Sequence, residues 1–374
     1  MLLNPIWQLV FKKDIKILKI DMIEILKDKI DWVGALNTIN HTDFYFSYDY
    51  HHFSKNQGEE PILIKYSTKE GVLLLPLLLR KIEGTVFKDA ISVYGYAGVL
   101  TNIPLENFDR DMFQKTLHNF FKDNQIISVF SRLHPFMEYQ DEILEGLGSI
   151  SDQGMVVYLE LSLPIDVQRA GFNRRLKTYL NKARKVCTVS MGTTEEELDA
   201  FIHLYHENMK RVEATESYYF DKPYFDALMA SKDYEPCLMV CRDNETQQII
   251  AGAIFVKKDN MVQYHLSGLH EDFFELNPIK LIIDEMRLMV SEEGYEFMNL
   301  GGGRGGSNED SLFRFKSGFS KAFKKFKLWK YIVDEEAYQI LIEEHFSKYD
   351  DINLNEISYF PAYRADVTEF SEAK

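Results

Sequence analysis

The amino-acid sequence predicts an α/β (α+β) fold built from two similar units placed in tandem. In residues 195–301, the apolar pattern gives one helix, three consecutive strands, a second helix and a fourth strand. The first half of the chain repeats this order more loosely. With 374 residues, 45% of them hydrophobic, the chain is long enough for two units that each bury a core. We therefore expect mixed sheets flanked by helices.

The elements of the second half follow from helical spacing, capping residues and turn formers. Apolar residues recur at helical spacing from Leu198 to Met209 and predict a helix that begins at Glu195. Asn277 as N-cap and Pro278 in the first turn predict a second helix. Strands are predicted at 235–243, 248–258, 260–269 and 295–300.

The first half and the tail are less regular. Strands are predicted at 61–66, 72–82, 125–133 and 155–161, and helices around 22–39, at 108–122 and at 334–346. The glycine- and serine-containing stretch 146–154 and Pro164 indicate a boundary between the units. We therefore divide the chain into an N-terminal unit, residues 1–165, and a C-terminal unit, residues 166–374.

The charge distribution argues against general binding of DNA. The formal net charge is −15, yet 15 of the 43 basic residues lie in 166–190 and 304–330, which together hold only three acids. A polyanion needs an electropositive face, which this chain offers only at these two segments. We therefore expect a phosphate-bearing partner to bind locally.

Cysteine usage and apolar runs indicate a cytoplasmic protein without a metal site. Three cysteines give no disulfide framework. Cys237 and Cys241 are four residues apart on a predicted strand, roughly 13 Å and too far for a bond or a shared metal. The apolar runs at 72–79 and 2–14 are too short or too broken for a membrane span or a signal segment.

The stretch 299–320, NLGGGRGGSNEDSLFRFKSGFS, concentrates glycine and positive charge. Gly301, Gly303 and Gly306 satisfy G-x-G-x-x-G after a strand, but no acid follows about twenty residues later for a ribose hydroxyl, and no Walker motif follows either. We expect a strand-to-helix turn in which Ser307 caps a short helix that buries Leu312, Phe315 and Phe319. Amides at the helix start, with Arg304 beside them, would attract an anion. A glycine turn without a ligand is the alternative.

Residues 172–185, FNRRLKTYLNKARK, form the most amphipathic predicted helix. Its outward side chains are cationic: Arg174, Arg175, Lys177, Lys182, Arg184 and Lys185. A solvated face is one interpretation. Because almost no acid lies near these cations in the sequence, a phosphate-bearing partner such as RNA, coenzyme A or a sugar nucleotide is the other.

Strand alternation divides the side chains of the strand MVQYHLSGL, 261–269, into two sets. One set is Gln263, His265 and Ser267, and the other is Val262, Tyr264 and Leu266. His265 has an ordinary pKa near neutrality, which suits a group that takes a proton from an attacking amine, although a structural histidine is the alternative. Tyr94 and Tyr96, in SVYGYAG, could line a pocket floor or serve packing alone.

Four stretches resemble the FemABX-type, peptidoglycan-bridge-forming branch of the GNAT acyltransferases. They are YGYAGVL at 94–100, NRRLKTYLNKARK at 173–185, YHLSGL at 264–269, and NLGGG with DSLFRFKSGFS in 299–320. The resemblance covers about residues 45–332, and its last motif is the most specific. It implies two GNAT-like units side by side, with a substrate cleft between or beside them.

The resemblance also implies an activity and site residues. The family transfers an amino acid from aminoacyl-tRNA, or in other GNAT branches an acyl group from coenzyme A, to an amine. In bridge-forming members the acceptor is a nucleotide- or lipid-linked muropeptide. The Phe-Lys of the last motif falls on Phe315 and Lys316, and this lysine is expected to meet phosphate or developing negative charge. The basic helix falls on 174–185, where family members contact backbone phosphates.

We therefore expect a cytoplasmic aminoacyl- or acyltransferase that acts on cell-envelope precursors of peptidoglycan or surface polysaccharide. It would hold no cofactor tightly and use aminoacyl-tRNA or acyl-coenzyme A as donor. Lys316 and His265 are the candidate catalytic residues. Candidate substrate or phosphate contacts are Arg304, Arg314, Arg174, Arg175, Lys182, Tyr94, Tyr96, Gln263 and Ser267.

Other functions stay open. Coenzyme-A-binding GNAT proteins usually carry Arg/Gln-x-x-Gly-x-Gly/Ala where this chain has the acidic HEDFFELNPIK, 270–280, which argues against simple coenzyme A binding. An acyl-coenzyme A N-acyltransferase with a non-standard loop is one alternative. A non-catalytic module that binds a phosphorylated ligand or RNA through the two basic segments is the other.

Overall fold

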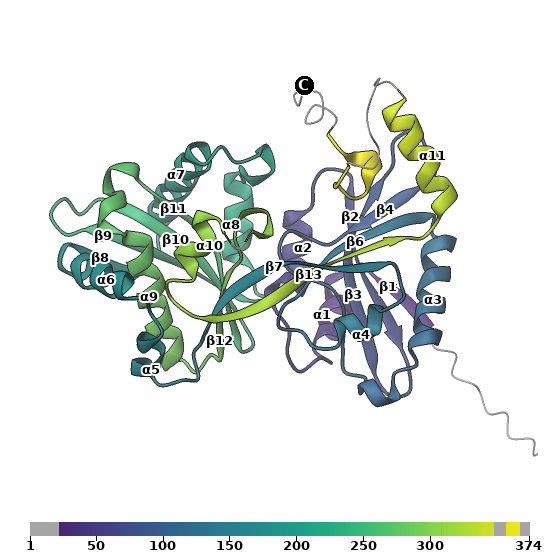
Figure 1. The fold of residues 1–374 in the computed structure, drawn as a ribbon, viewed down its shortest axis with the longest axis horizontal. Helices are drawn as coiled ribbons and strands as arrows, with labels where there is room; N and C mark the ends of the chain where they lie inside the picture. The colour runs from purple at the N-terminus through teal and green to yellow at the C-terminus, as the bar shows by residue number, and fades with distance from the viewer. Residues whose placement is uncertain (1–21, 308, 348–356, 367–374) are drawn as a thin grey trace, which may run out of the picture.

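The structure is a computed structural model that describes residues 22–307, 309–347 and 357–366. The stretch 2–14, in which we expect no signal segment, lies outside these residues. Two lobes lie side by side, and one mixed sheet of 13 strands runs through both (Figure 1). Its order is β1-β2-β3-β4-β6-β13-β7-β12-β11-β10-β9-β8, with β5 paired to β3. The predicted α/β class, a mixed sheet flanked by helices in both units, is confirmed.

The first unit is a largely antiparallel sheet with helices against it. Its strands are β1 (Met22–Leu26), β2 (Glu59–Ser67), β3 (Val72–Lys81), β4 (Lys88–Ile91), β5 (Leu100–Thr101) and β6 (Ile126–Leu133). Its helices are α1 (Lys29–Leu36), α2 (Tyr48–Ser54), α3 (Arg110–Asp123) and α4 (Gln140–Leu144), with the turn η2 (Phe44–Phe46). Asp109 caps α3 by accepting from the amide of Met112, and the helix buries Phe113 and Phe121 against the sheet. Neither face of β3 meets water, which explains its unbroken apolar run.

The second unit has helices on both faces of its sheet. Its strands are β8 (Cys187–Met191), β9 (Glu235–Asp243), β10 (Ile249–Lys258), β11 (Met261–Leu269) and β12 (Phe297–Gly301). Its helices are α5 (Ile165–Ala170), α6 (Arg174–Val186), α7 (Glu195–Arg211), α8 (Lys222–Ala230), α9 (Pro278–Glu292) and α10 (Ser311–Lys316). Helices α6 and α9 share one core, and α7 and α8 share the core on the other face. Thr194 and Glu197 form a capping box that fixes the start of α7.

Two long strands join the units. Strands β7 (Ser149–Glu160) and β13 (Ala322–Ile332) pair with each other, and β13 also pairs with β6 while β7 also pairs with β12. We predicted separate mixed sheets, but these shared strands make the sheet continuous, as Figure 1 shows. Strand β13 was not predicted, because its four lysines among apolar residues look like a basic surface segment.

Polar contacts fix one unit against the other. The Asp259 carboxylate accepts hydrogen bonds from both the amide and the hydroxyl of Thr42, each at 2.7 Å. Lys29 lies 2.6 Å from Asp49 in its own unit and 3.0 Å from Asp233 in the second. Because the Lys29 charge is paired and the Thr42 donors are hydrogen-bonded, a shift of one unit against the other would leave these polar groups without partners.

The tail returns to the first unit. Helix α11 (Glu335–Phe346) packs near β6, and the turn η8 (Ala362–Arg364) packs on α11. The fully buried Asp89 accepts hydrogen bonds from Arg80 at 2.6 Å, Arg364 at 2.5 Å and Tyr363 at 3.1 Å. The boundary between 1–165 and 166–374 stays a prediction, and the described contacts of β13 and α11 run across it.

Most predicted elements of the second half form within one or two residues of the expected ends. The helical expectation around 22–39 is wrong at its start, where β1 pairs with β2 before α1 begins. Edge-strand pairing overrides local helix propensity there. In the described part of the chain, no helix has the length and apolar character that crossing a membrane requires.

Candidate active site

Lys316 is a buried lysine at the end of a short helix. Helix α10 buries Phe313 and leaves Lys316 only 8% exposed. The Lys316 amino group donates to the carbonyl oxygen of Gly302 at 2.8 Å and lies 6.0 Å from the centre of the Tyr264 ring. Asp310, not Ser307 as predicted, is the N-cap, because its carboxylate accepts from the amide of Phe313 at 2.8 Å.

The predicted buried face of this helix is also shifted. Phe319 is fully buried as expected, but Leu312 is exposed and Phe315 is half-buried. Capping at Asp310 instead of Ser307 starts the helix later and rotates its faces, so that Phe313 and Lys316 point inward.

Burial lowers the pKa of Lys316 to about 8, and the Asp310 carboxylate opposes part of this shift. The amino group is therefore charged at neutral pH, and it loses its charge as the pH rises through about 8. A positive charge in a site with little water interacts more strongly with a developing negative charge than one in solution does.

The glycines of this stretch allow close approach of the backbone. Gly301 has a φ of +77°, which favours glycine. A Cβ atom on Gly302 would lie 2.9 Å from the carbonyl oxygen of Met155 in β7. The stretch is therefore a tight turn packed against β7. The position of the Gly302 carbonyl that accepts from Lys316 requires residues without side chains in this turn.

A β-bulge in β11 redirects the side chains that follow it. Ile254 of β10 pairs with Leu266, whereas Phe255 pairs with Tyr264, so that His265 is the extra residue. The predicted alternation is therefore wrong beyond the bulge: Leu266 packs with the α7 and α8 core, and Ser267 accepts a hydrogen bond from Tyr264 on the opposite face at 2.5 Å.

The bulge aims His265 at aromatic rings of both units. Its Nε2 lies 3.0 Å from the Tyr224 hydroxyl, and its buried Nδ1 has no hydrogen-bond partner among the described residues. The rings of Phe44, Tyr45 and Tyr50 surround it, and burial lowers the pKa of His265 to about 3. The imidazole is thus neutral at physiological pH and a weak proton acceptor.

Tyr94 and Tyr96 lie where the two units meet. Tyr94 contacts the rings of His265 and Tyr218, both from the second unit. Burial raises the pKa of Tyr96 to about 12, and the backbone of nearby Gly302 opposes part of this shift. Gly302 therefore lies close to Tyr96 of the first unit and accepts a hydrogen bond from Lys316 of the second.

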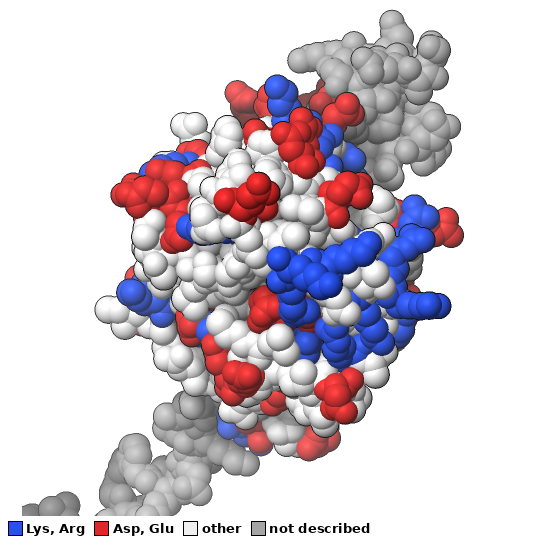
Figure 2. All heavy atoms as spheres, turned by 90° about the vertical axis from the view of Figure 1, so that its left-hand side faces the viewer, with Lys and Arg blue, Asp and Glu red and all other residues white. Residues whose placement is uncertain are grey.

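The outward side of α6 is cationic, as predicted. Arg174, Arg175 and Lys182 are exposed and have no carboxylate partner among the described residues, whereas Arg184 pairs with Asp284 at 2.7 Å. Helix α6 lies at the end of the molecule drawn in Figure 2, where Lys and Arg side chains gather densely on one side.

The two basic segments adjoin in space. The amide of Asn173 at the start of α6 donates to the carbonyl of Gly318 just after α10, at 2.9 Å. Lys280 of α9 lies between them, 4.7 Å from the Tyr179 ring of α6 and 5.6 Å from the Phe315 ring of α10. The cationic helix α6 thus begins beside the end of the helix that buries Lys316.

The remaining predicted residues are placed differently. Arg304 and Arg314 are exposed, and Arg304 lies 3.5 Å from the carbonyl oxygen of Val212. Gln263 is 2% exposed and has both amide atoms bonded to protein groups. The structure therefore brings together Tyr96, the glycine turn and Lys316, with His265 on the opposite face of β11. Their catalytic and binding roles stay predictions.

Sequence analysis missed three buried residues that bond to this region: Asp43, His134 and Asn299. No local pattern marks them, because each is a single polar residue in an apolar or turn segment. Only the long-range packing of β6, β12 and η2 places them together.

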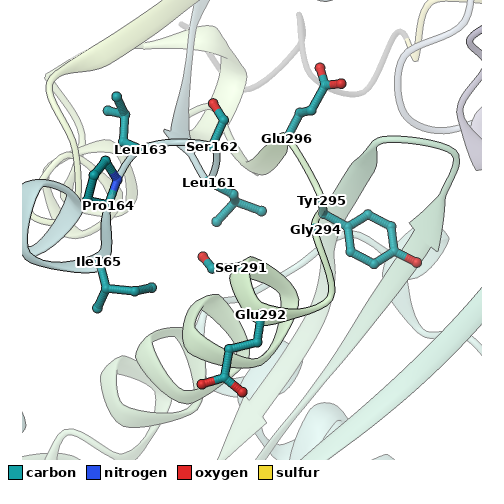
Figure 3. A pocket seen from close by; sticks show the side chains of 10 residues that line it. All are labelled: Leu161, Ser162, Leu163, Pro164, Ile165, Ser291, Glu292, Gly294, Tyr295 and Glu296. Carbon is teal, nitrogen blue, oxygen red and sulfur yellow. The ribbon is translucent and has the colours of Figure 1, made fainter.

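Two surface cavities lie elsewhere. One, of about 360 Å³, lies between the connection from β7 to α5 and the end of α9, where Leu161 and Ile165 lie near Ser291 (Figure 3). The other, of about 490 Å³, is lined by His134, Gln140 and Lys327 among others. Lys316 and His265 line neither. No group of three His, Cys, Asp or Glu side chains in the described ranges is arranged to hold a metal ion.

Comparisons with known proteins agree with the resemblance in the motifs. Residues 237–327 match the model of the FemAB family. The fold matches the crystal structure of FemX with a TM-score of 0.65 at 14% identity, over 85% of this chain and 99% of that chain. The chain is therefore FemABX-like in fold and in the segment that contains Lys316.

Two further structures share the fold. The C-terminal domain of a putative lysylphosphatidylglycerol synthetase from Agrobacterium fabrum matches with a TM-score of 0.54 at 14% identity, over 85% of this chain and 97% of that chain. A conserved protein of unknown function from Bacteroides thetaiotaomicron matches with a TM-score of 0.55 at 11% identity, over 83% of this chain and all of that chain. A search of curated proteins gave no match.

Proposed function

We propose that this chain is an acyltransferase that moves an aminoacyl or acyl group from a phosphate-bearing donor to an amine of a cell-envelope precursor. The observation that carries the proposal is Lys316. It lies within the segment that matches the FemAB family, it is buried, and its one described hydrogen bond goes to a backbone carbonyl. Burying a charge without a bonded carboxylate is costly, so a function must retain it.

The chemistry is direct attack of the acceptor amine on the donor carbonyl. A C–N bond forms and the C–O or C–S bond to the donor breaks, and the proton lost by the amine balances the leaving group. In the intermediate, the carbonyl oxygen carries negative charge. An ammonium group in a site with little water stabilises such an oxyanion, and this is the role proposed for Lys316.

The thiols of the chain support direct transfer without a covalent enzyme intermediate. All three cysteines are buried, and burial raises the pKa of Cys237 to about 11, so that it stays a thiol. His265, with its lowered pKa, is a weak general base at neutral pH. The oxygen or sulfur of the leaving group, which becomes an anion as the donor bond breaks, is therefore a better proton acceptor in this site.

Two features favour aminoacyl-tRNA over coenzyme A as the donor. The connection from β11 to α9, where a coenzyme A pyrophosphate would need backbone amides, is the turn η5 (Glu271–Leu276) with acids at Glu271, Asp272 and Glu275. These carboxylates repel a pyrophosphate. The unpaired cations of α6 instead form a surface suited to the phosphate backbone of RNA.

Transfer assays test the proposal. The purified chain is incubated with a pool of labelled aminoacyl-tRNAs, or with labelled acetyl-coenzyme A, and with a UDP-linked muropeptide as acceptor. Labelled acceptor formed from aminoacyl-tRNA, and lost in Lys316→Met, is the expected result. Transfer only from acetyl-coenzyme A would show that the donor is an acyl-coenzyme A and not aminoacyl-tRNA. Binding of tRNA without any transfer would instead support a non-catalytic RNA-binding module, which the exposed cations of α6 also fit.

A further inference from the structure

Four buried polar side chains connect the first unit to the glycine turn. Asp43 precedes η2, His134 follows β6, Gln263 lies on β11 and Asn299 lies on β12, and none is more than 2% exposed. The Asp43 carboxylate lies 2.7 Å from His134 Nε2 and 2.5 Å from Gln263 Nε2. The side-chain oxygen of Gln263 lies 2.8 Å from the Asn299 amide nitrogen.

The partners fix the direction of every hydrogen bond in this network. His134 Nδ1 accepts from the backbone amide of Phe136 at 3.2 Å, so Nε2 carries the proton that it donates to Asp43. Gln263 donates to Asp43 and must therefore turn its oxygen to Asn299. Asn299 donates to Gln263, and its oxygen accepts from the backbone amide of Gly301 at 2.9 Å. The donors thus converge on the Asp43 carboxylate: Gly301, Asn299 and Gln263 form one chain that ends there, and His134 donates to it directly.

The network ends at the residue that sets the position of the Lys316 acceptor. Gly301 has a φ of +77° and ends β12, where the pairing of β12 with β7 shifts register. The next residue, Gly302, presents its carbonyl to Lys316. Strands β11 and β12 pair only from Met261 to Gln263, so beyond that point no strand hydrogen bond from β11 holds the glycine turn. The side chain of Asn299 supplies a hold there.

We propose that Asp43, His134, Gln263 and Asn299 are positioning residues that hold the glycine turn and, through Gly302, the amino group of Lys316. The consequence is that Asp43 and His134 of the first unit act on the proposed reaction through the glycine turn, without contacting the donor or acceptor themselves. This inference rests on the proposed function for its kinetic effect, whereas the hold on Gly301 is a property of the folded chain alone.

Substitutions at Gln263 test the network, with the same substitutions at Gln168 as matched controls. Gln263→Met removes the amide's hydrogen bonds with Asp43, Asn299 and the sulfur of Met261 at every pH. In Gln263→Glu, the new carboxyl faces Asp43 at 2.5 Å, and two carboxylates at that distance cannot both ionise. The variant keeps the network only while a proton is shared between them. His134 and the nearby Tyr45 hydroxyl are the other titratable groups beside Asp43.

Gln168 is a buried glutamine that donates to the carbonyls of Leu161 and Leu163 and accepts from Arg287, away from the glycine turn. Gln168→Met and Gln168→Glu are expected to lower the midpoint of thermal unfolding without changing kcat per folded molecule. They separate a loss of stability from a loss of positioning.

Two readouts are measured from pH 6 to pH 8.5: kcat and KM for transfer, and amide hydrogen exchange of Gly301 in the 15N-glycine-labelled chain. We expect the ratio of kcat in Gln263→Glu to kcat in the wild type to fall at least about tenfold as the pH rises, with KM unchanged, and Gly301 exchange to accelerate in parallel. Gln263→Met is expected to show low kcat and fast exchange at every pH.

The outcomes separate this inference from the proposed function. A flat kcat ratio together with wild-type exchange of Gly301 in both Gln263 variants would overturn the inference. Wild-type protein that transfers nothing would overturn the proposed function, and the exchange of Gly301 would then decide the positioning alone. If Gln263→Met does not fold, Gln263→Glu alone tests the inference. Its kcat and Gly301 exchange at pH 6 are then compared with the same two quantities at pH 8.5.

Discussion

The amino group of Lys316 lies 2.8 Å from the carbonyl oxygen of Gly302, and no carboxylate hydrogen bond to this lysine occurs in the described chain. A lysine that served folding alone would be paired or exposed. Here the backbone of a glycine turn holds the charge in place, and in the proposed reaction this charge meets the negative charge that develops on the substrate. The glycine turn is therefore part of the proposed site.

Replacing Lys316 by methionine should slow transfer strongly and stabilise the fold. Loss of an oxyanion-stabilising donor lowers kcat by about 100- to 1,000-fold. Because burial lowers the pKa of Lys316 from its ordinary 10.5 to about 8, the folded protein bears a cost below pH 8 that methionine removes. We expect the free energy of unfolding at pH 7 to rise by roughly 1–3 kcal/mol. Kinetics and urea unfolding check both effects.

The matched control is Lys321→Met, which changes an exposed lysine that donates to the carbonyl of Ser317. This substitution should leave both kcat and the free energy of unfolding unchanged. A Lys316→Met variant that keeps wild-type kcat would remove this residue from the mechanism.

The pH profile should report the ionisation of Lys316. The acceptor amine must lose a proton to attack, so the rate rises with pH at first. The rate then falls above about pH 8, where Lys316 loses its charge. Lys316→Arg keeps its charge at all these pH values, so any residual activity should lack the alkaline fall. An alkaline fall that persists in Lys316→Arg would assign it to another group.

The cations of α6 should govern binding of the donor. Replacing Arg174, Arg175 and Lys182 together by alanine is expected to weaken tRNA binding and to lower the slope of log K against log salt by about one for each phosphate that these side chains neutralise. Fluorescence anisotropy at several salt concentrations measures this slope. Lys115→Ala, on the exposed side of α3 in the first unit, is the control and should leave the slope unchanged.

The Asp89 cluster should be the most sensitive link between the tail and the first unit. Asp89→Ala leaves Arg80 and Arg364 without their buried partner and is expected to lower the free energy of unfolding by about 3–5 kcal/mol. Glu60→Ala, which removes an exposed ion pair with Lys27, should cost at most about 1 kcal/mol. Equal effects of the two substitutions would show that Asp89 is not a buried anchor.

The sequence was most informative where a segment carries its own signal. Helix α7 follows from its apolar spacing, and α6 from its amphipathic pattern. The specific motif around Phe315 and Lys316 indicates the family by its residues alone. These features depend on neighbours within a few residues, so they can be read locally.

The rest depends on contacts between distant segments. The bulge at His265 is a mismatch between β10 and β11, which alternation within one strand cannot reveal. The lysines of β13 make its sequence unlike that of a central strand, and pairing with β6 on one side and β7 on the other stabilises it. Gln263 looks like a residue that faces a substrate, and only the position of Asp43, 220 residues earlier, shows that its amide is already occupied.

The path of β13 has a consequence for synthesis. In the first lobe, this strand lies between β6 and β7 and pairs with both. Strands β6 and β7, made within residues 126–160, therefore lack this shared partner until residues 322–332 have been made. The sheet of the first lobe, although most of it is made first, is therefore completed only near the end of synthesis. Fragments that end before residue 322 should expose unpaired strand edges, and they are expected to need chaperones or to aggregate.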